Sequence, residues 1–193
     1  MAEMEASTAI KRVRTHGEKS AAYMADGYAR ATRRPGICMA QTVGGLNLAA
    51  GLRDAYLAKS PVIAMTGGRD PATKFRKVYQ QVDDVPAFDG VTKFNATVDS
   101  VERFPDMVRQ AFRTAVSGSP GPVHLQFRGN EGQIDLEEAE MDVEVDELFS
   151  AVPPFRPEPS ASSIAAAVAV LQSAEKPVIV AGGGARWSQA GPA

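Results

Sequence analysis

The sequence predicts an α/β protein in which an open parallel sheet carries helices on both faces, followed by the first βα step of a second α/β domain. Three observations support this prediction. Short apolar runs alternate with helical segments between residues 18 and 127. Glycine or proline marks most of the boundaries between them. The helical segments are amphipathic, as expected where helices cover a sheet whose strands are themselves buried.

The first part of the chain supplies two helix and strand pairs. Apolar and small side chains recur near helical spacing, and each strand-like run follows a proline or glycine. The expected elements are a helix over 18–32, a strand over 36–40, a helix over 46–58 that ends near Lys59, and a strand over 62–66. Residues 10–15, IKRVRT, are a further plausible strand ahead of the first helix.

A third unit follows a long irregular stretch that begins after Gly68. Residues 93–98 are strand-like, and residues 101–116 predict an amphipathic helix. Residues 123–127, VHLQF, then form a strand introduced by a turn rich in glycine and proline. The apolar face of the predicted helix consists of Val101, Phe104, Met107, Val108, Ala111, Phe112 and Ala115.

The composition changes after Asn130. Residues 131–147 are strongly acidic, and AVPPFRPEPS contains four prolines, which suits an extended linker. Ser160 can cap a helix, and KPVIVAGGGA predicts a strand that ends in a glycine turn. The predicted organisation is a first domain over 1–148, a linker over 149–160 and the beginning of a second domain over 161–193.

Composition excludes several classes of function. The chain has 193 residues with 21 basic and 23 acidic side chains, a net charge of −2, so it offers no basic field for nucleic acid. The longest apolar run, 164–171, is far shorter than the ~20 residues needed to span a bilayer. The first residues lack the features of a signal peptide, so the expected location is the cytosol. Neither a nucleic acid nor a membrane is an expected partner.

Ligands of open parallel sheets bind at the carboxyl ends of the strands, so the residues that follow each apolar run are the candidates. The first is Glu18, whose carboxylate would lie at the amino end of a helix. The second is the turn QTVGGLN at 41–47, and the third is Gly67-Gly68 with the long loop after it. Simpler readings stay open: a carboxylate that only stabilises its helix, a plain glycine turn and a solvated loop.

The histidines, the cysteine and the aromatic side chains are interpreted structurally. His124 alternates with apolar residues in its strand, which favours a structural role, while His16 lies close to Glu18. Cys38 is expected to be a small core residue that forms no disulfide. Two histidines and one thiol do not make a zinc cluster, and the acidic run near residue 140 is expected to be solvated. The expected packing aromatics include Tyr23, Tyr28, Phe112 and Trp187.

Taken together, these segments resemble one enzyme family. HGEKSAAYMADGYARATRRPGICMA resembles the segment in which a glutamate opens a helix in thiamine-diphosphate-dependent enzymes of the acetolactate synthase, pyruvate oxidase and benzoylformate decarboxylase type. Four further segments follow in the family's order: NLAAGLRDAYLAKSPVIAMTGG, the Tyr79-Gln80-Gln81 element, VTKFNATVDSVERFPDMVRQAFRTAVSGSPGPVHL and KPVIVAGGGA. The resemblance implies a pyrimidine-binding domain followed by the beginning of the family's central domain.

The resemblance implies a catalytic role for Glu18. In the family, the equivalent carboxylate bonds a ring nitrogen of the aminopyrimidine, favours its imino tautomer and so promotes the C2 ylide. The reaction would be a carboligation or decarboxylation of a 2-oxo acid, catalysed by a transferase or a lyase. By the same resemblance the cofactor-binding residues would be Gly44, Gly45, Asn47, Gly67 and Gly68, with Tyr79 and Gln80 facing substrate.

The chain also departs from the family pattern. Gly17 separates His16 from Glu18, and the turn at 41–47 is one residue shorter than the common version. The family's first strand and helix would precede Ile10, and its magnesium- and diphosphate-binding motif does not occur, so no metal ligand is expected in this chain. We therefore expect an inactive chain on its own, active in a homo-oligomer or hetero-assembly that supplies the diphosphate-binding domain. FAD binding stays undecided, and the alternative is a non-catalytic folded interaction domain.

Overall fold

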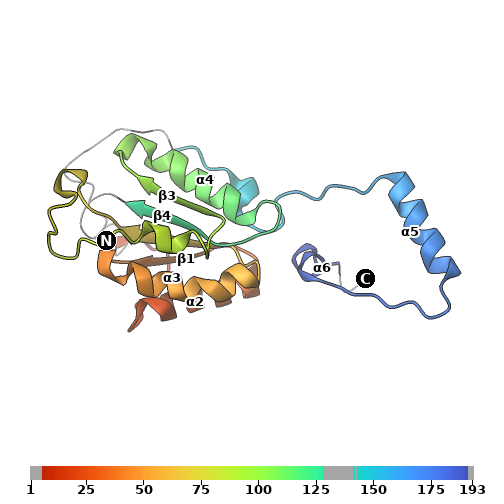
Figure 1. The fold of residues 1–193 in the computed structure, drawn as a ribbon. Coiled ribbons are helices and arrows are strands. Elements are labelled where there is room, and N and C mark those ends of the chain that lie inside the picture. The colour runs from red at the N-terminus through yellow and green to blue at the C-terminus, as the bar shows by residue number, and fades with distance from the viewer. Residues whose placement is uncertain (1–5, 128–140, 142, 191–193) are drawn as a thin grey trace.

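A computed structural model describes residues 6–127, 141 and 143–190, and its centre is a four-stranded parallel sheet in the order β1-β2-β4-β3 (Figure 1). The predicted α/β class is confirmed, as are four of the five strands predicted before residue 128. The strands are β1 (Gly36–Ala40), β2 (Val62–Gly67), β3 (Phe94–Val98) and β4 (Val123–Phe127).

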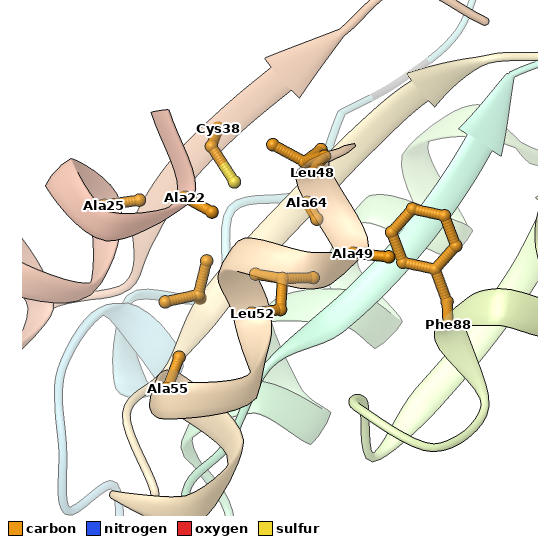
Figure 2. Packing of buried hydrophobic residues seen from close by; sticks show 10 residues of the cluster. Ala22, Ala25, Cys38, Leu48, Ala49, Leu52, Ala55, Ala64 and Phe88 are labelled. Atoms are coloured by element: carbon orange, nitrogen blue, oxygen red, sulfur yellow. The ribbon is translucent and has the colours of Figure 1, made fainter. Parts of the chain in front are cut away.

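One face of the sheet is covered by α2 (Glu18–Thr32) and α3 (Gly45–Leu57), both where the sequence predicts helices. Figure 2 shows the buried side chains between these helices and the sheet, where Ala22, Cys38 and Leu48 come from α2, β1 and α3. The helices approach closely at Gly51, where a Cβ would lie 2.7 Å from the Cβ of Ala22. Small residues therefore set the spacing of α2 and α3.

The opposite face is covered by α4 (Phe104–Val116), which packs over β2, β3 and β4. Its buried residues Ala111 and Ala115 lie on the predicted apolar face. Because α4 does not extend over the edge strand β1, Ile37 and Met39 are 52% and 43% exposed. The prediction of helices on both faces is thus confirmed for the inner strands.

The chain continues beyond β4 with helices that contribute little to the main core. Ser160 caps α5 (Ala161–Ser173) as predicted, since its Oγ accepts a hydrogen bond from the Ser163 amide at 3.2 Å. All of α5 is exposed. Trp187 of α6 (Gly183–Ser188) is buried with Val116 and Val152. Short 3-10 turns are η1 (Thr42–Gly44), η2 (Pro71–Thr73), η3 (Val85–Phe88), η4 (Val101–Arg103) and η6 (Glu147–Ser150).

Some predictions of local structure are wrong. Neither 10–15 nor 178–180 forms a strand, because neither segment pairs with a strand in the described part of the chain and an unpaired strand leaves its backbone groups unbonded. Tyr23 and Tyr28 are 45% and 49% exposed, since α2 turns its alanines toward the core. Most of the acidic run at 131–147, including residue 140, lies outside the described residues. Among the described residues, no helix is long and apolar enough to cross a bilayer.

Candidate functional site

The candidate residues gather where the parallel strands end. Because α2 precedes β1 and α3 follows it, the amino ends of both helices lie at the carboxyl edge of the sheet. Glu18 is the first residue of α2, and η1 and α3 begin directly after β1. This arrangement brings Glu18 and the turn at 41–47 together, although they belong to different segments of the sequence.

The side chain of Glu18 is held between two residues of that turn. The amide Nδ2 of Asn47 donates a hydrogen bond to Glu18 Oε2 at 3.3 Å. The other carboxylate oxygen lies over Gly44, where an added Cβ would be 2.7 Å from both Oε1 and Cγ. Placement in the first turn of a helix is favourable for a carboxylate. Glu18, Gly44 and Asn47 therefore form one contiguous cluster.

A second carboxyl group, Asp84, lies against the neighbouring glycine, Gly45. Asp84 is 1% exposed, and its Oδ1 accepts a hydrogen bond from Gln126 Nε2 at 2.8 Å. Its Oδ2 is buried and has no hydrogen-bond partner within the part of the chain that the structure describes. Burial raises the pKa of Asp84, because removing the group from water penalises its charged form. Sequence reasoning missed this residue, since an aspartate in a polar loop carries no local sign of burial.

His124, the second residue of β4, is wholly buried. Its Nδ1 lies 2.7 Å from Asn95 Oδ1, which can only accept, so Nδ1 carries the proton and Nε2 accepts from the Thr66 hydroxyl at 2.8 Å. The ring stacks on Phe88 with centroids 3.5 Å apart. Asn95 Nδ2 in turn donates to the carbonyl oxygen of Val85 at 2.6 Å. This network anchors the turn after Asp84, which agrees with the structural role predicted for His124.

Gly67 and Gly68, at the end of β2, contact the neighbouring strand β4. Gly67 ends β2 and pairs with Phe127, and the Gly68 amide donates to the Phe127 carbonyl. A Cβ on Gly68 would lie 2.7 Å from that carbonyl oxygen and 3.0 Å from Gln126 Cγ. The space beside Gly68 is therefore filled by protein, and its packing with β4 explains this glycine without a ligand.

The predicted substrate-facing residues lie in the loop that follows. Gln41, directly after β1, donates from Nε2 to Gln80 Oε1 at 3.3 Å, which places Gln80 beside the turn that contains Gly44. Tyr79 is 83% exposed. His16 is exposed, and no hydrogen bond between it and Glu18 occurs in the described structure. Gln80 therefore joins the candidate site, whereas Tyr79 and His16 lie at the surface.

Comparison with known proteins finds relatives that cover most of this chain. Residues 1–87 match the family described as thiamine pyrophosphate enzyme, N-terminal TPP binding domain. Over 180 residues the chain is 34% identical to a probable acetolactate synthase large subunit of Methanocaldococcus jannaschii, covering 91% of this chain and 30% of that protein. Over 188 residues it is 32% identical to the 2-hydroxyacyl-CoA lyase of Arabidopsis thaliana, covering 94% of this chain and 32% of that protein.

A solved structure from Mycobacterium smegmatis, provisionally described as a thiamin diphosphate-dependent enzyme, matches 70% of this chain and 27% of its own with a TM-score of 0.59. At 23% sequence identity, this likeness supports the fold alone. The chain spans about a third of the length of the curated relatives described above.

Proposed function

Through residues 1–87 this chain belongs to the N-terminal domain family of thiamine pyrophosphate enzymes, and on that premise we propose that it is the pyrimidine-binding part of an acetolactate synthase-like enzyme. The enzyme would be a cytosolic, thiamine-diphosphate-dependent carboligase or decarboxylase of 2-oxo acids. Residues 1–148 would form the pyrimidine-binding domain, 149–160 a linker and 161–193 the start of the central domain. The observation that carries the proposal is the position of Glu18 between Asn47 and Gly44.

The residues at this edge fit an aminopyrimidine ring. Asn47 bonds Glu18 Oε2, while Oε1 has no hydrogen-bond partner among the described residues and faces a glycine rather than a side chain. The hydroxyl of Thr42 in the same turn is buried, and none of the residues that the structure describes forms a hydrogen bond with it. A planar heterocycle with ring nitrogens and an exocyclic amine offers donors and acceptors for such groups. The missing side chains at Gly44 and Gly45 let the carboxyl groups of Glu18 and Asp84 approach the turn closely.

Thiamine diphosphate, when bound, supplies the carbanion chemistry at the carbonyl carbon of the 2-oxo acid. The carboxyl group of Glu18 would bond a pyrimidine ring nitrogen and hold a proton there, favouring the imino tautomer. Asn47 would keep that carboxyl group in one orientation. Gly67 and Gly68 would support the pocket wall, and Gln80, with Tyr79 at the surface, would face the substrate.

Completing the active site would require a diphosphate-binding domain, which also holds magnesium. We propose that, in a homo-oligomer or a hetero-assembly, such a domain packs against the edge of the sheet that carries Glu18.

The test uses this chain mixed with the protein that supplies the diphosphate-binding domain, with thiamine diphosphate, magnesium and pyruvate. We expect turnover in the mixture and a loss of roughly a hundredfold or more in Glu18→Gln, which removes the proton-holding carboxyl group but keeps its shape. Asp106→Asn is the matched control, because Asp106 is also an acid in the first turn of a helix, α4, and lies outside the cluster. Turnover that survives Glu18→Gln would overturn the proposal, and a mixture without any cofactor binding would favour a non-catalytic interaction domain.

A further inference from the structure

A pocket of about 100 Å³ lies at the edge of the sheet opposite to Glu18, where the strands begin. Lys59 precedes β2, Lys93 directly precedes β3, and Gly121 precedes β4, so three connections meet there. The pocket is lined by Tyr56, Lys59, Lys93, Ser119, Pro120 and Gly121. None of these residues is acidic, and two of them are cations.

Lys93 is a fixed cation. Its Nζ donates to the carbonyl oxygens of Thr114 at 2.6 Å and Ser117 at 2.9 Å, at the carboxyl end of α4. The negative end of the helix dipole favours a positive charge in that place. A Cβ on Gly121 would lie 2.7 Å from Lys93 Cδ, so the glycine leaves room for the side chain to pass. An ammonium group has three donors, and these two bonds leave one of them for a ligand.

Lys59 supplies the second cation. It follows the end of α3 in the left-handed conformation, with φ 57°, and its Nζ lies 4.8 Å from the centre of the Tyr56 ring. Burial, and after it the charge of Lys59, lowers the pKa of Lys93, so the two ammonium groups repel each other. No ion pair of either lysine with an acidic side chain occurs among the described residues. An anion between them would relieve this repulsion.

We propose that the pocket between Lys59 and Lys93 binds a small oxyanion, the chemistry shared by inorganic phosphate and a carboxylate group. A single water molecule needs a cavity volume of only ~10–15 Å³. The pocket has a volume of about 100 Å³ and therefore has room for a small oxyanion. Ser119 and Tyr56 carry hydroxyl groups that can donate further hydrogen bonds. The site is separate from the proposed cofactor edge, so it does not depend on the proposed function.

The experiment titrates the full chain, labelled with ¹⁵N, with inorganic phosphate and separately with acetate, against sodium chloride at matched ionic strength. We expect saturable shifts of the Lys59, Lys93 and Gly121 amide signals with phosphate, acetate or both. Shifts with phosphate alone would assign the ligand as a phosphate, and shifts with acetate would extend it to carboxylates. Glu18→Gln is expected to leave this binding unchanged.

Lys59→Gln tests the site without removing the hydrogen bonds of Lys93 to α4. We expect it to weaken oxyanion binding about fivefold, the scale of one exposed charge interaction. Lys74→Gln is the control, because Lys74 also lies over an aromatic ring, 5.3 Å from the centre of Phe75, but outside the pocket. The proposal would be overturned if neither anion produced saturable shifts, or if both substitutions weakened binding equally.

Discussion

The carboxylate of Glu18 lies over the backbone of Gly44, so closely that an added Cβ would come within 2.7 Å of Glu18 Oε1. Gly44 has φ −78°, which any residue can adopt, so the position requires space rather than unusual backbone geometry. The amino ends of α2 and α3 therefore meet without an intervening side chain. A substitution at Gly44 can therefore displace the carboxylate of Glu18 while Glu18 itself is kept.

We predict that Gly44→Ala displaces the Glu18 carboxylate and leaves the fold almost unchanged. The added methyl group meets the end of a flexible side chain, so the free energy of unfolding should change by less than about 1 kcal/mol. Turnover of the assembled enzyme should fall strongly, because the carboxylate no longer has its position beside Asn47. Urea unfolding and the turnover assay described above measure the two effects. Gly17→Ala is the control, since its Cβ would meet nothing within 4 Å.

In contrast to Gly44→Ala, Gly51→Ala should lower the stability of the fold. Here the Cβ would lie 2.7 Å from Ala22 Cβ and 2.8 Å from the Lys19 carbonyl oxygen, so α2 and α3 must move apart. Overpacking of this kind costs about 1–3 kcal/mol, which urea unfolding would detect. Equal loss of stability in Gly44→Ala and Gly51→Ala would contradict the distinction between a flexible and a rigid neighbour.

A further prediction concerns the buried carboxyl group of Asp84. Burial raises its pKa above the ordinary 3.8, so its contribution to stability is greatest at low pH and is lost as the pH rises through the folded-state pKa. Asp84→Asn removes the buried charge but retains an acceptor for Gln126. The variant should therefore be more stable than the parent chain at pH 7, and this difference should shrink as the pH approaches 4.

Urea unfolding at several pH values measures this effect, with Asp106→Asn as an exposed control. A variant that is less stable than the parent chain at neutral pH would show that the Asp84 carboxylate is well accommodated despite its unpartnered oxygen.

The sequence predicted the elements whose signals are local. Strand β1 has the predicted bounds because an apolar run follows Pro35, and α2 begins at Glu18 and ends at Thr32 because its small residues recur at helical spacing. Residues 10–15 and 178–180 have strand-like composition, but no strand among the described residues lies beside them, and pairing is not encoded in the segment itself. Local composition therefore predicts the element only where a partner is present.

The residues of the candidate site also differ in whether the sequence alone could predict them. Glu18 could be proposed because its position before a helix matches an ordered series of segments, and its neighbours Gly44 and Asn47 follow from the same series. Asp84 could not, because its burial depends on Gly45 and Gln126, which lie in distant segments. Gly68 follows β2 as the sequence predicts, but it contacts the carbonyl oxygen of Phe127 in the neighbouring strand.

The last prediction follows from the buried, neutral state of His124. Burial lowers its pKa from 6.5 to about 3, and both ring nitrogens are already bonded, to Asn95 and Thr66. Because the pKa is lower in the folded chain than in the unfolded chain, this histidine contributes stability above pH 6.5 that is lost as the pH falls toward 3. The slope of the free energy of unfolding against pH should approach ~1.4 kcal/mol per pH unit for one proton.

The variant His124→Phe keeps a ring against Phe88 and should flatten this slope between pH 6.5 and 5. It should also lower stability at pH 7, because it leaves two polar partners unpaired. An unchanged slope in this variant, or a His124 ring signal that titrates near pH 6.5 in the folded chain, would contradict the prediction.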